Sequence, residues 1–144
     1  MLLGLDPVLG PDLLHALAAM GHGDRIALVD ANYPATRGRR LIHLPGLSTP
    51  RVLQAVLSVF PIDTFIADPC AVMQVVGDPG AVPPVVAEMT AVLAKRSAKS
   101  AVGLERSAFY AAAEAAYVIV QTGERLFYGN ILLTKGVVAP EEQS

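Results

Sequence analysis

Residues 11–30 read PDLLHALAAMGHGDRIALVD, and this stretch decides the fold class because a helix, a loop and a strand follow one another in it. Pro11 is typical of a first helical turn, and apolar residues then repeat at helical spacing. We expect Gly21 to end the helix with a positive φ. The aliphatic run 26–29 predicts a buried strand with Asp30 at its carboxyl end.

The rest of the chain continues this alternation. Further strands are expected at 41–44, 64–66, 71–76, 117–121 and 131–133, and further helices at 49–60, 85–93 and 107–116, the last capped by Ser107. A chain of 144 residues suits one core. Strands alternating with helices predict a single α/β domain, residues 1–144, with three layers: a largely parallel central sheet and helices on both faces.

The composition argues against several classes of partner. Eleven Lys and Arg against thirteen Asp and Glu give a net charge of −2, so nucleic acid is not expected. No apolar run reaches the roughly 20 residues of a spanning helix, and the N-terminus lacks the features of a secretory signal. The lone Cys70 cannot form an internal disulfide, which favours the cytoplasm. With 53% hydrophobic residues, the chain is expected to cover apolar surface as a homo-oligomer.

Two residues that flank the first predicted strand are candidates for catalysis or ligand binding. His22 lies between two glycines and carries an imidazole, which titrates near neutrality and suits acid/base catalysis; the alternative is a loop histidine favoured by the helix dipole. Asp30 ends a central strand, where open α/β sheets bind ligands, although such acids also cap turns. Phosphate-loop, dinucleotide, zinc-protease and hydrolase motifs are absent from the sequence, so no cofactor or metal is expected.

Several other reactive side chains have simpler explanations. His15 shares a helical face with polar and small residues, and His43 lies in a short strand, so both are expected to be structural. Cys70 is expected to be a small buried hydrophobe. Phe109 and Phe127 are expected to be core aromatics.

Read together, a set of short motifs in a fixed order resembles the L-fucose mutarotase and D-ribose pyranase family from about residue 3 to residue 138. The motifs are MGHGD at 20–24, DANYP at 30–34, Arg106, FY at 109–110, TGER at 122–125 and YGNILL at 128–133. Gly23 and the 124–130 segment look closer to the fucose branch. The segment Thr36–Arg40 departs in length and charge from the family pattern, which leaves the identity of the sugar open.

The resemblance implies a cofactor-free isomerase that interconverts the α and β anomers of a monosaccharide. It also implies a ring-shaped homo-oligomer, often a decamer, with sites near subunit contacts. The family's catalytic histidine falls on His22 and its sugar-binding residues on Asp30, Arg106, Tyr128, Gly129 and Asn130. In this hypothesis His22 exchanges one proton, Tyr128 or a water handles the other, and the remaining residues hold sugar hydroxyls. The alternatives are a D-ribose pyranase and a noncatalytic sugar-binding module.

Overall fold

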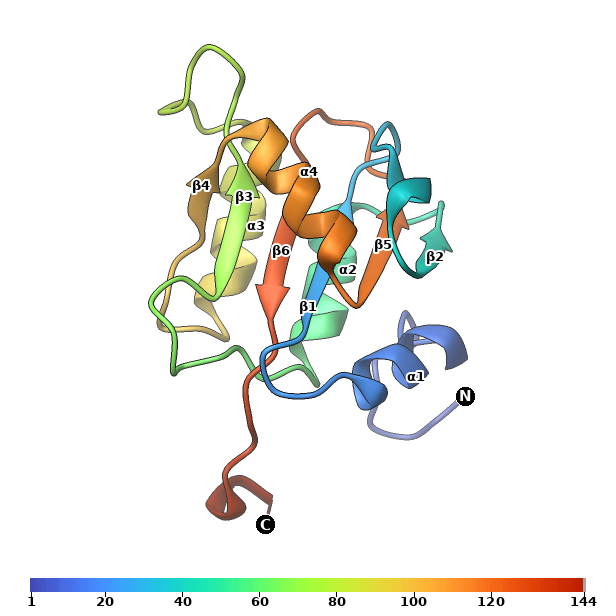
Figure 1. Cartoon of the computed structure of the whole chain (residues 1–144). Helices are drawn as coiled ribbons and strands as arrows, with labels where there is room; N and C mark the ends of the chain where they lie inside the picture. Colours follow the sequence, from blue (N-terminus) through green and yellow to red (C-terminus); the bar gives the residue numbers. More distant parts are fainter. Residues whose placement is uncertain (144) are drawn as a thin grey trace.

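A computed structural model describes residues 1–143, so Ser144, the last residue of the expected domain, lies outside it. Figure 1 shows one mixed sheet with strand order β2-β5-β1-β6-β3-β4. The strands are β1 (Arg25–Val29), β2 (Leu41–Leu44), β3 (Cys70–Met73), β4 (Val102–Leu104), β5 (Val118–Thr122) and β6 (Ile131–Thr134). The helices are α1 (Pro11–Ala19), α2 (Thr49–Leu57), α3 (Pro84–Ala94) and α4 (Arg106–Ala115), with short 3-10 helices at Ala35–Arg37 and Pro140–Gln143.

The sheet is parallel except for β6. Parallel pairs join β1 to β5, β2 to β5 and β3 to β4, whereas β6 runs antiparallel between β1 and β3. Five strands therefore point the same way. Below, the end of the sheet where these five strands finish is called the carboxyl edge, and the end where they start is called the amino edge.

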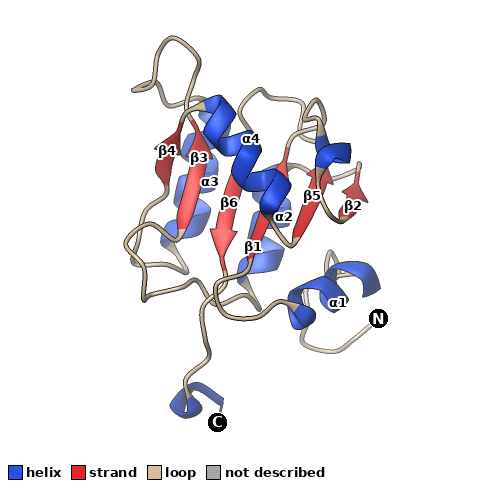
Figure 2. Ribbon diagram, viewed as in Figure 1, coloured by secondary structure: helices blue, strands red, loops and turns tan. Residues whose placement is uncertain are grey.

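Helices cover both faces of the sheet, as Figure 2 shows. Alternate residues of β1 face opposite layers: Ile26 and Leu28 pack with α1, α2 and α3 in one core, and Ala27 and Val29 pack with α4 in the other. These four side chains are all fully buried. Burial on both faces explains why the strand is continuously aliphatic rather than alternating, and the predicted α/β class with a largely parallel central sheet is confirmed.

Three local predictions were wrong. Residues 64–66 form bends and not a strand, because the Asp63 carboxylate accepts the Phe65 N–H at 3.0 Å and turns the chain. Gly21 does not have a positive φ; Gly23 does, at 89°. The N-cap residue of α4 is Glu105, and the Ser107 hydroxyl donates to the Glu105 carboxylate instead of accepting a backbone N–H as a cap would. The short strand β4 was not predicted, because its three residues carry no periodic pattern.

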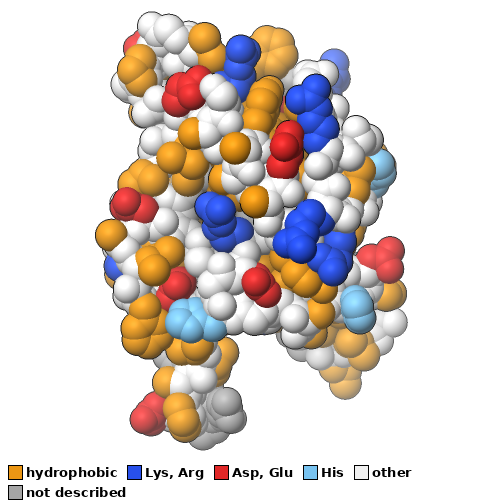
Figure 3. All heavy atoms as spheres, in the orientation of Figure 1, with side chains coloured by type: hydrophobic (Ala, Val, Ile, Leu, Met, Phe, Trp, Pro, Cys, Tyr) orange, Lys and Arg blue, Asp and Glu red, His pale blue; other side chains and the backbone are white. Residues whose placement is uncertain are grey.

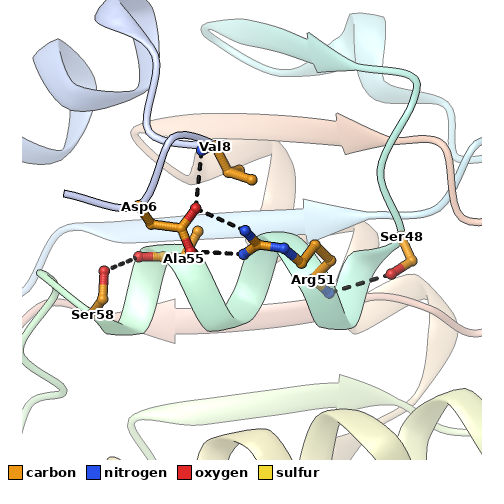
Figure 4. Close-up of polar contacts among 6 residues, drawn as sticks. All are labelled: Asp6, Val8, Ser48, Arg51, Ala55 and Ser58. Carbon is orange, nitrogen blue, oxygen red and sulfur yellow. Dashed lines mark hydrogen bonds and ion pairs between the residues drawn. The ribbon is translucent and has the colours of Figure 1, made fainter. Parts of the chain in front are cut away.

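The N-terminal segment is tied to α2 by an ion pair. The Arg51 guanidinium donates to both carboxylate oxygens of Asp6 at 2.7 and 2.8 Å. Asp6 also accepts the Val8 N–H, and Figure 4 shows these contacts. The Ser48 hydroxyl caps α2 by accepting the Arg51 N–H. The Arg51 hydrogen bonds lower the pKa of Asp6, as does the Val8 N–H. This contact fixes the chain that leads into α1.

Candidate functional site

The candidate residues fall at two opposite edges of the sheet. Asp30 follows β1, Asn130 precedes the antiparallel β6, and Arg106 follows β4, so all three lie at the carboxyl edge. His22 precedes β1 and lies at the amino edge, where the Gly23 N–H donates to the Lys135 carbonyl at 2.8 Å. The five residues of β1 separate the two edges, a span of roughly 16 Å at about 3.3 Å per residue.

At the carboxyl edge, Asp30 and Asn130 form a buried pair. The Asn130 side-chain oxygen accepts the Asp30 N–H at 2.8 Å, and its amide nitrogen donates to the Asp30 carboxylate at 3.0 Å. The other carboxylate oxygen accepts the Asn32 N–H at 3.0 Å. Burial raises the pKa of Asp30, while the hydrogen bonds from Asn32 and Asn130 oppose that rise. The Asn130 side chain therefore binds both the backbone N–H and the carboxylate of Asp30, and it holds this carboxylate at the end of β1.

A buried polar network supports the turn that contains Tyr128 and Gly129. The Thr49 hydroxyl donates to the Gly129 carbonyl at 2.8 Å and shares a hydrogen bond with the Thr122 hydroxyl at 2.9 Å. The Glu124 carboxylate accepts the Thr49 N–H at 3.3 Å. A Cβ at Gly129 would lie 2.6 Å from the Glu124 side chain, so the turn needs glycine here for close approach.

Tyr128 has an unusual backbone conformation. Among residues 1–143 it is the one non-glycine residue with a positive φ, at 71°. Such a conformation costs of order 1–3 kcal/mol and is typical of functional sites. The Tyr128 hydroxyl accepts the Val76 N–H at 3.1 Å, so its own proton is free to be donated elsewhere.

Arg106 lines a cavity that is connected to this tyrosine through Val76. The cavity has a volume of about 310 Å³ and is lined by Arg106, Glu105 and the turn 74–79 that contacts Tyr128. Arg106 is exposed at the first turn of α4. The carboxyl edge thus holds a guanidinium, a phenol and a carboxylate, groups that bind sugar hydroxyls through directed hydrogen bonds.

At the amino edge, His22 has its own set of contacts. Its Nε2 lies 3.1 Å from a carboxylate oxygen of Asp63, and its ring centroid lies 5.4 Å from that of Phe65. The His22 side chain is 46% exposed, whereas that of Asp63 is only 3% exposed. His22 also lines a cavity of about 490 Å³ with Met20 and Lys135. The ring is accessible and held in place, as an acid/base group must be.

One chain does not bring all the predicted site residues together. The structure places Asp30, Asn130, Tyr128, Gly129 and Arg106 along the carboxyl edge, with Arg106 three strands away from Asp30, and it places His22 at the amino edge. The candidate residues therefore form two separate groups in each chain. A site that uses both must combine the amino edge of one copy with the carboxyl edge of another.

The remaining reactive side chains are placed mostly as expected. His15 is exposed on α1, and His43 on β2 lies 3.1 Å from Gln121. Cys70 is buried, which raises the pKa of its thiol to about 12. Phe109 is a core aromatic, but Phe127 is 72% exposed, so its assignment to the core was wrong.

The sequence reading missed residues that support the site from a distance. Asp63 follows Ile62 in a short segment for which no helix or strand is predicted, and Thr49 carries only the signal of a helix start. No sequence pattern indicates that the backbone N–H of Val76 donates to the Tyr128 hydroxyl. Asp63 could have been noticed as an acid in a largely hydrophobic stretch; the structure shows that it is buried, and a buried acid requires partners.

Two further features of the described chain bear on function. Among residues 1–143, no three His, Cys, Asp or Glu side chains are grouped closely enough to hold a metal ion. In the same residues, no helix is long and apolar enough to cross a membrane.

Comparison with known proteins adds to this geometry. Residues 3–138 match the model of the RbsD / FucU transport protein family. A fucose mutarotase of Bos taurus is 40% identical, and the match covers 99% of this chain and 97% of the relative. The crystal structure of the Streptococcus pneumoniae fucose mutarotase in complex with L-fucose has a TM-score of 0.89 at 35% identity, covering 96% of this chain and 100% of the other. Bacillus subtilis RbsD complexed with D-ribose shares the fold at 20% identity, with a TM-score of 0.74 and coverage of 91% and 95%.

Proposed function

This chain belongs to the RbsD / FucU family, and from that premise we propose that it is an isomerase that interconverts the α and β anomers of L-fucose. The observation that carries the proposal is the match over nearly the whole chain to fucose mutarotases at about 40% identity. The fucose assignment is preferred to ribose because the ribose-bound relative shares only the fold with this chain. The monosaccharide is the only ligand that the mechanism needs.

The reaction needs two proton transfers, and two groups are proposed for them. His22 takes the proton of the anomeric hydroxyl as the carbonyl forms at C1 and the bond from C1 to the ring oxygen breaks. Tyr128 gives a proton to that ring oxygen. After rotation about the C1–C2 bond the steps reverse, and both groups return to their starting protonation states. Acid/base help of this kind is worth roughly 10² to 10⁴-fold, enough to matter for a reaction that also proceeds unaided.

The carboxyl edge holds the sugar in this proposal. The Asp30 carboxylate accepts from sugar hydroxyls and Arg106 donates to them across the cavity beside Tyr128. Asn130 keeps the Asp30 carboxylate in place and offers its remaining amide hydrogen. Gly129 permits the tight turn that presents Tyr128. The binding surface is therefore preorganised, which lowers the free-energy cost of ordering its side chains when the sugar binds.

Because His22 lies at the opposite edge, the proposed site is completed by a second copy of the chain. Both edges carry exposed apolar side chains that such a contact would bury: Phe65 and Val137 beside His22, and Leu126 and Phe127 beside Tyr128. Figure 3 shows hydrophobic side chains at the lower end of the molecule, near the C-terminal segment. Contact between two different edges is heterologous, and repeating it forms a ring when the rotation between copies closes.

The finer assignments follow from this arrangement. We propose a ring-shaped homo-oligomer, a decamer as the family resemblance implies, in which residues 1–144 form one mutarotase domain per copy. A cytoplasmic location is proposed because the single Cys70 is free and buried, which fits a reducing compartment.

Exchange NMR tests the proposed activity directly. L-Fucose is mixed with the protein, and cross-peaks between its anomers are expected to grow faster than in buffer; D-ribose and other hexoses run beside it as comparisons. Faster pyranose–furanose exchange of ribose than anomer exchange of fucose would reassign the protein as a pyranase. Sugar binding by saturation transfer with no acceleration for any sugar would make it a noncatalytic binding module.

A further inference from the structure

Lys135 directly follows β6 and pairs through its backbone with the loop 21–24, which carries His22. The Lys135 N–H donates to the Asp24 carbonyl and the Lys135 carbonyl accepts the Gly23 N–H, both at 2.8 Å. The loop is also closed on itself, because the Asp24 N–H donates to the Gly21 carbonyl at 3.1 Å. The end of β6 therefore holds the part of the loop that comes after His22.

The Lys135 side chain binds the end of α1, just before this loop. A helix leaves its last carbonyls without partners inside the helix, and continuation of α1 would bring the Gly21 N–H to the Leu17 carbonyl. That N–H donates instead to the Asp24 carboxylate at 2.7 Å. The Lys135 ammonium takes its place and donates to the Leu17 carbonyl at 2.7 Å and to the Met20 carbonyl at 2.6 Å.

The ammonium is also well placed electrostatically, and it belongs to a residue that lines the same cavity as His22. A cation is favoured at the carboxyl end of a helix, where the partial charge is negative, and hydrogen bonds from a charged donor are stronger than those from a neutral one. Lys135 is half-buried, and together with His22 it lines the cavity of about 490 Å³ at the amino edge. Removing the ammonium would therefore free the chain that leads into His22 at the wall of this cavity.

We propose that Lys135 is a positioning residue for His22. Its ammonium fixes the end of α1, its backbone fixes the loop beyond, and the imidazole between them keeps the orientation that proton exchange needs. This inference rests on the proposed function of His22. A base must lie within hydrogen-bond reach of the proton it takes, and a displacement of about 1 Å can cost roughly 100-fold in rate. Lys135 itself need not touch the sugar.

Substitutions at residue 135 remove the side-chain contacts and leave the backbone contacts in place. Lys135→Met keeps most of the aliphatic stem and loses the charge and the three N–H donors, whereas Lys135→Arg keeps a cation with several donors. Lys95→Met is the matched control, because it deletes an exposed ammonium from the residue that ends α3. Each variant is assayed for kcat and KM of L-fucose exchange, with a thermal melt to confirm folding.

A positioning role predicts that kcat per folded protein falls while KM stays within about 2-fold, because the carboxyl edge holds the sugar in the proposed site. We expect a kcat loss of roughly 10 to 100-fold for Lys135→Met, a smaller loss for Lys135→Arg, and none for Lys95→Met. A folded Lys135→Met with a lower Tm and the kcat of Lys95→Met would overturn the proposal, since the ammonium would then serve stability alone.

Hydrogen exchange followed by mass spectrometry gives a readout without any sugar. The backbone N–H groups of Gly21, Gly23 and Asp24 are hydrogen-bonded, and they should exchange about 10-fold faster in Lys135→Met, while β1 stays protected. Faster loop exchange with unchanged kcat, or a lower kcat with unchanged loop exchange, would overturn the proposal.

Two provisions keep this test decisive. If Lys135→Met does not fold, Lys135→Gln takes its place with the same expectations, because glutamine loses the charge and its shorter side chain reaches less far. A wild type that accelerates no sugar exchange would refute the proposed function, whereas loop exchange in these variants would still show whether Lys135 holds the loop.

Discussion

Substitution of Thr49 by valine should damage both stability and activity, because the Thr49 hydroxyl supports the turn that presents Tyr128. Thr49 is fully buried, and valine keeps its shape while removing the hydrogen bonds to the Gly129 carbonyl and the Thr122 hydroxyl. Leaving a buried carbonyl unpaired costs about 1–3 kcal/mol, and losing the second bond adds about 0.5–1.5 kcal/mol. A loss near 2–3 kcal/mol corresponds to a Tm decrease of roughly 6–12 °C for a chain of this size.

Calorimetry at matched protein concentration measures the stability, and exchange NMR on L-fucose measures the activity. Activity per folded protein should fall as well, since the freed Gly129 carbonyl lets the neighbouring Tyr128 move. Thr49→Ser is the control because it keeps the hydroxyl and loses only a methyl group, at a cost of about 1 kcal/mol. If valine proves as stable and active as threonine, or serine as harmful as valine, the supporting role of the hydroxyl is refuted.

Three further predictions concern other contacts. His22→Ala should lower L-fucose exchange by roughly 10² to 10⁴-fold with sugar binding retained in saturation-transfer NMR; wild-type exchange would remove His22 from the mechanism. Val76→Pro should reduce exchange about 3 to 10-fold, because it deletes the N–H that donates to the Tyr128 hydroxyl. The Tm should stay unchanged, since residue 76 precedes Gly77, whose φ is 79°, and this turn position suits proline. An unchanged exchange rate would show that the hydrogen bond is dispensable. Asp6→Asn should lower the free energy of unfolding by about 1 kcal/mol or less at pH 7. Pairing with Arg51 lowers the folded-state pKa of Asp6 below 3.8, so the Tm difference from wild type should shrink as the pH falls through that lowered pKa. A Tm difference that persists in strong acid would contradict the ion-pair explanation.

The fold was largely predictable because its buried elements carry strong local patterns. The aliphatic run 26–29 is buried on both faces and could only be a core strand or a helix, and the flanking turn residues decide between them. The strand wrongly placed at 64–66 failed for the opposite reason. Its hydrophobic residues Phe65 and Ile66 are exposed. The Phe65 N–H donates to the Asp63 carboxylate and sets the local conformation, and a hydrophobicity pattern does not reveal such a hydrogen bond.

The sequence indicates which residues are candidates for the site, but it indicates less about how they are arranged. Asp30 and Asn130 are 100 positions apart, yet each adjoins a strand at the same edge, so the topology brings them together. His22 and Asp30 flank one strand, and that alone places them at opposite edges within a chain. The supporting contacts of Asp63 and Val76 depend on loop geometry, which no short sequence motif encodes.

The most direct test of a shared site is to mix two inactive variants. His22→Ala and Tyr128→Phe are co-expressed, the mixed oligomers are purified through different tags, and L-fucose anomer exchange is measured by NMR. Random mixing in equal amounts should give an intact His22 and an intact Tyr128 at about a quarter of the contacts between copies, so exchange should rise to about a quarter of wild type. Mixed oligomers no more active than the average of the two separate variants would contradict a site built from two chains.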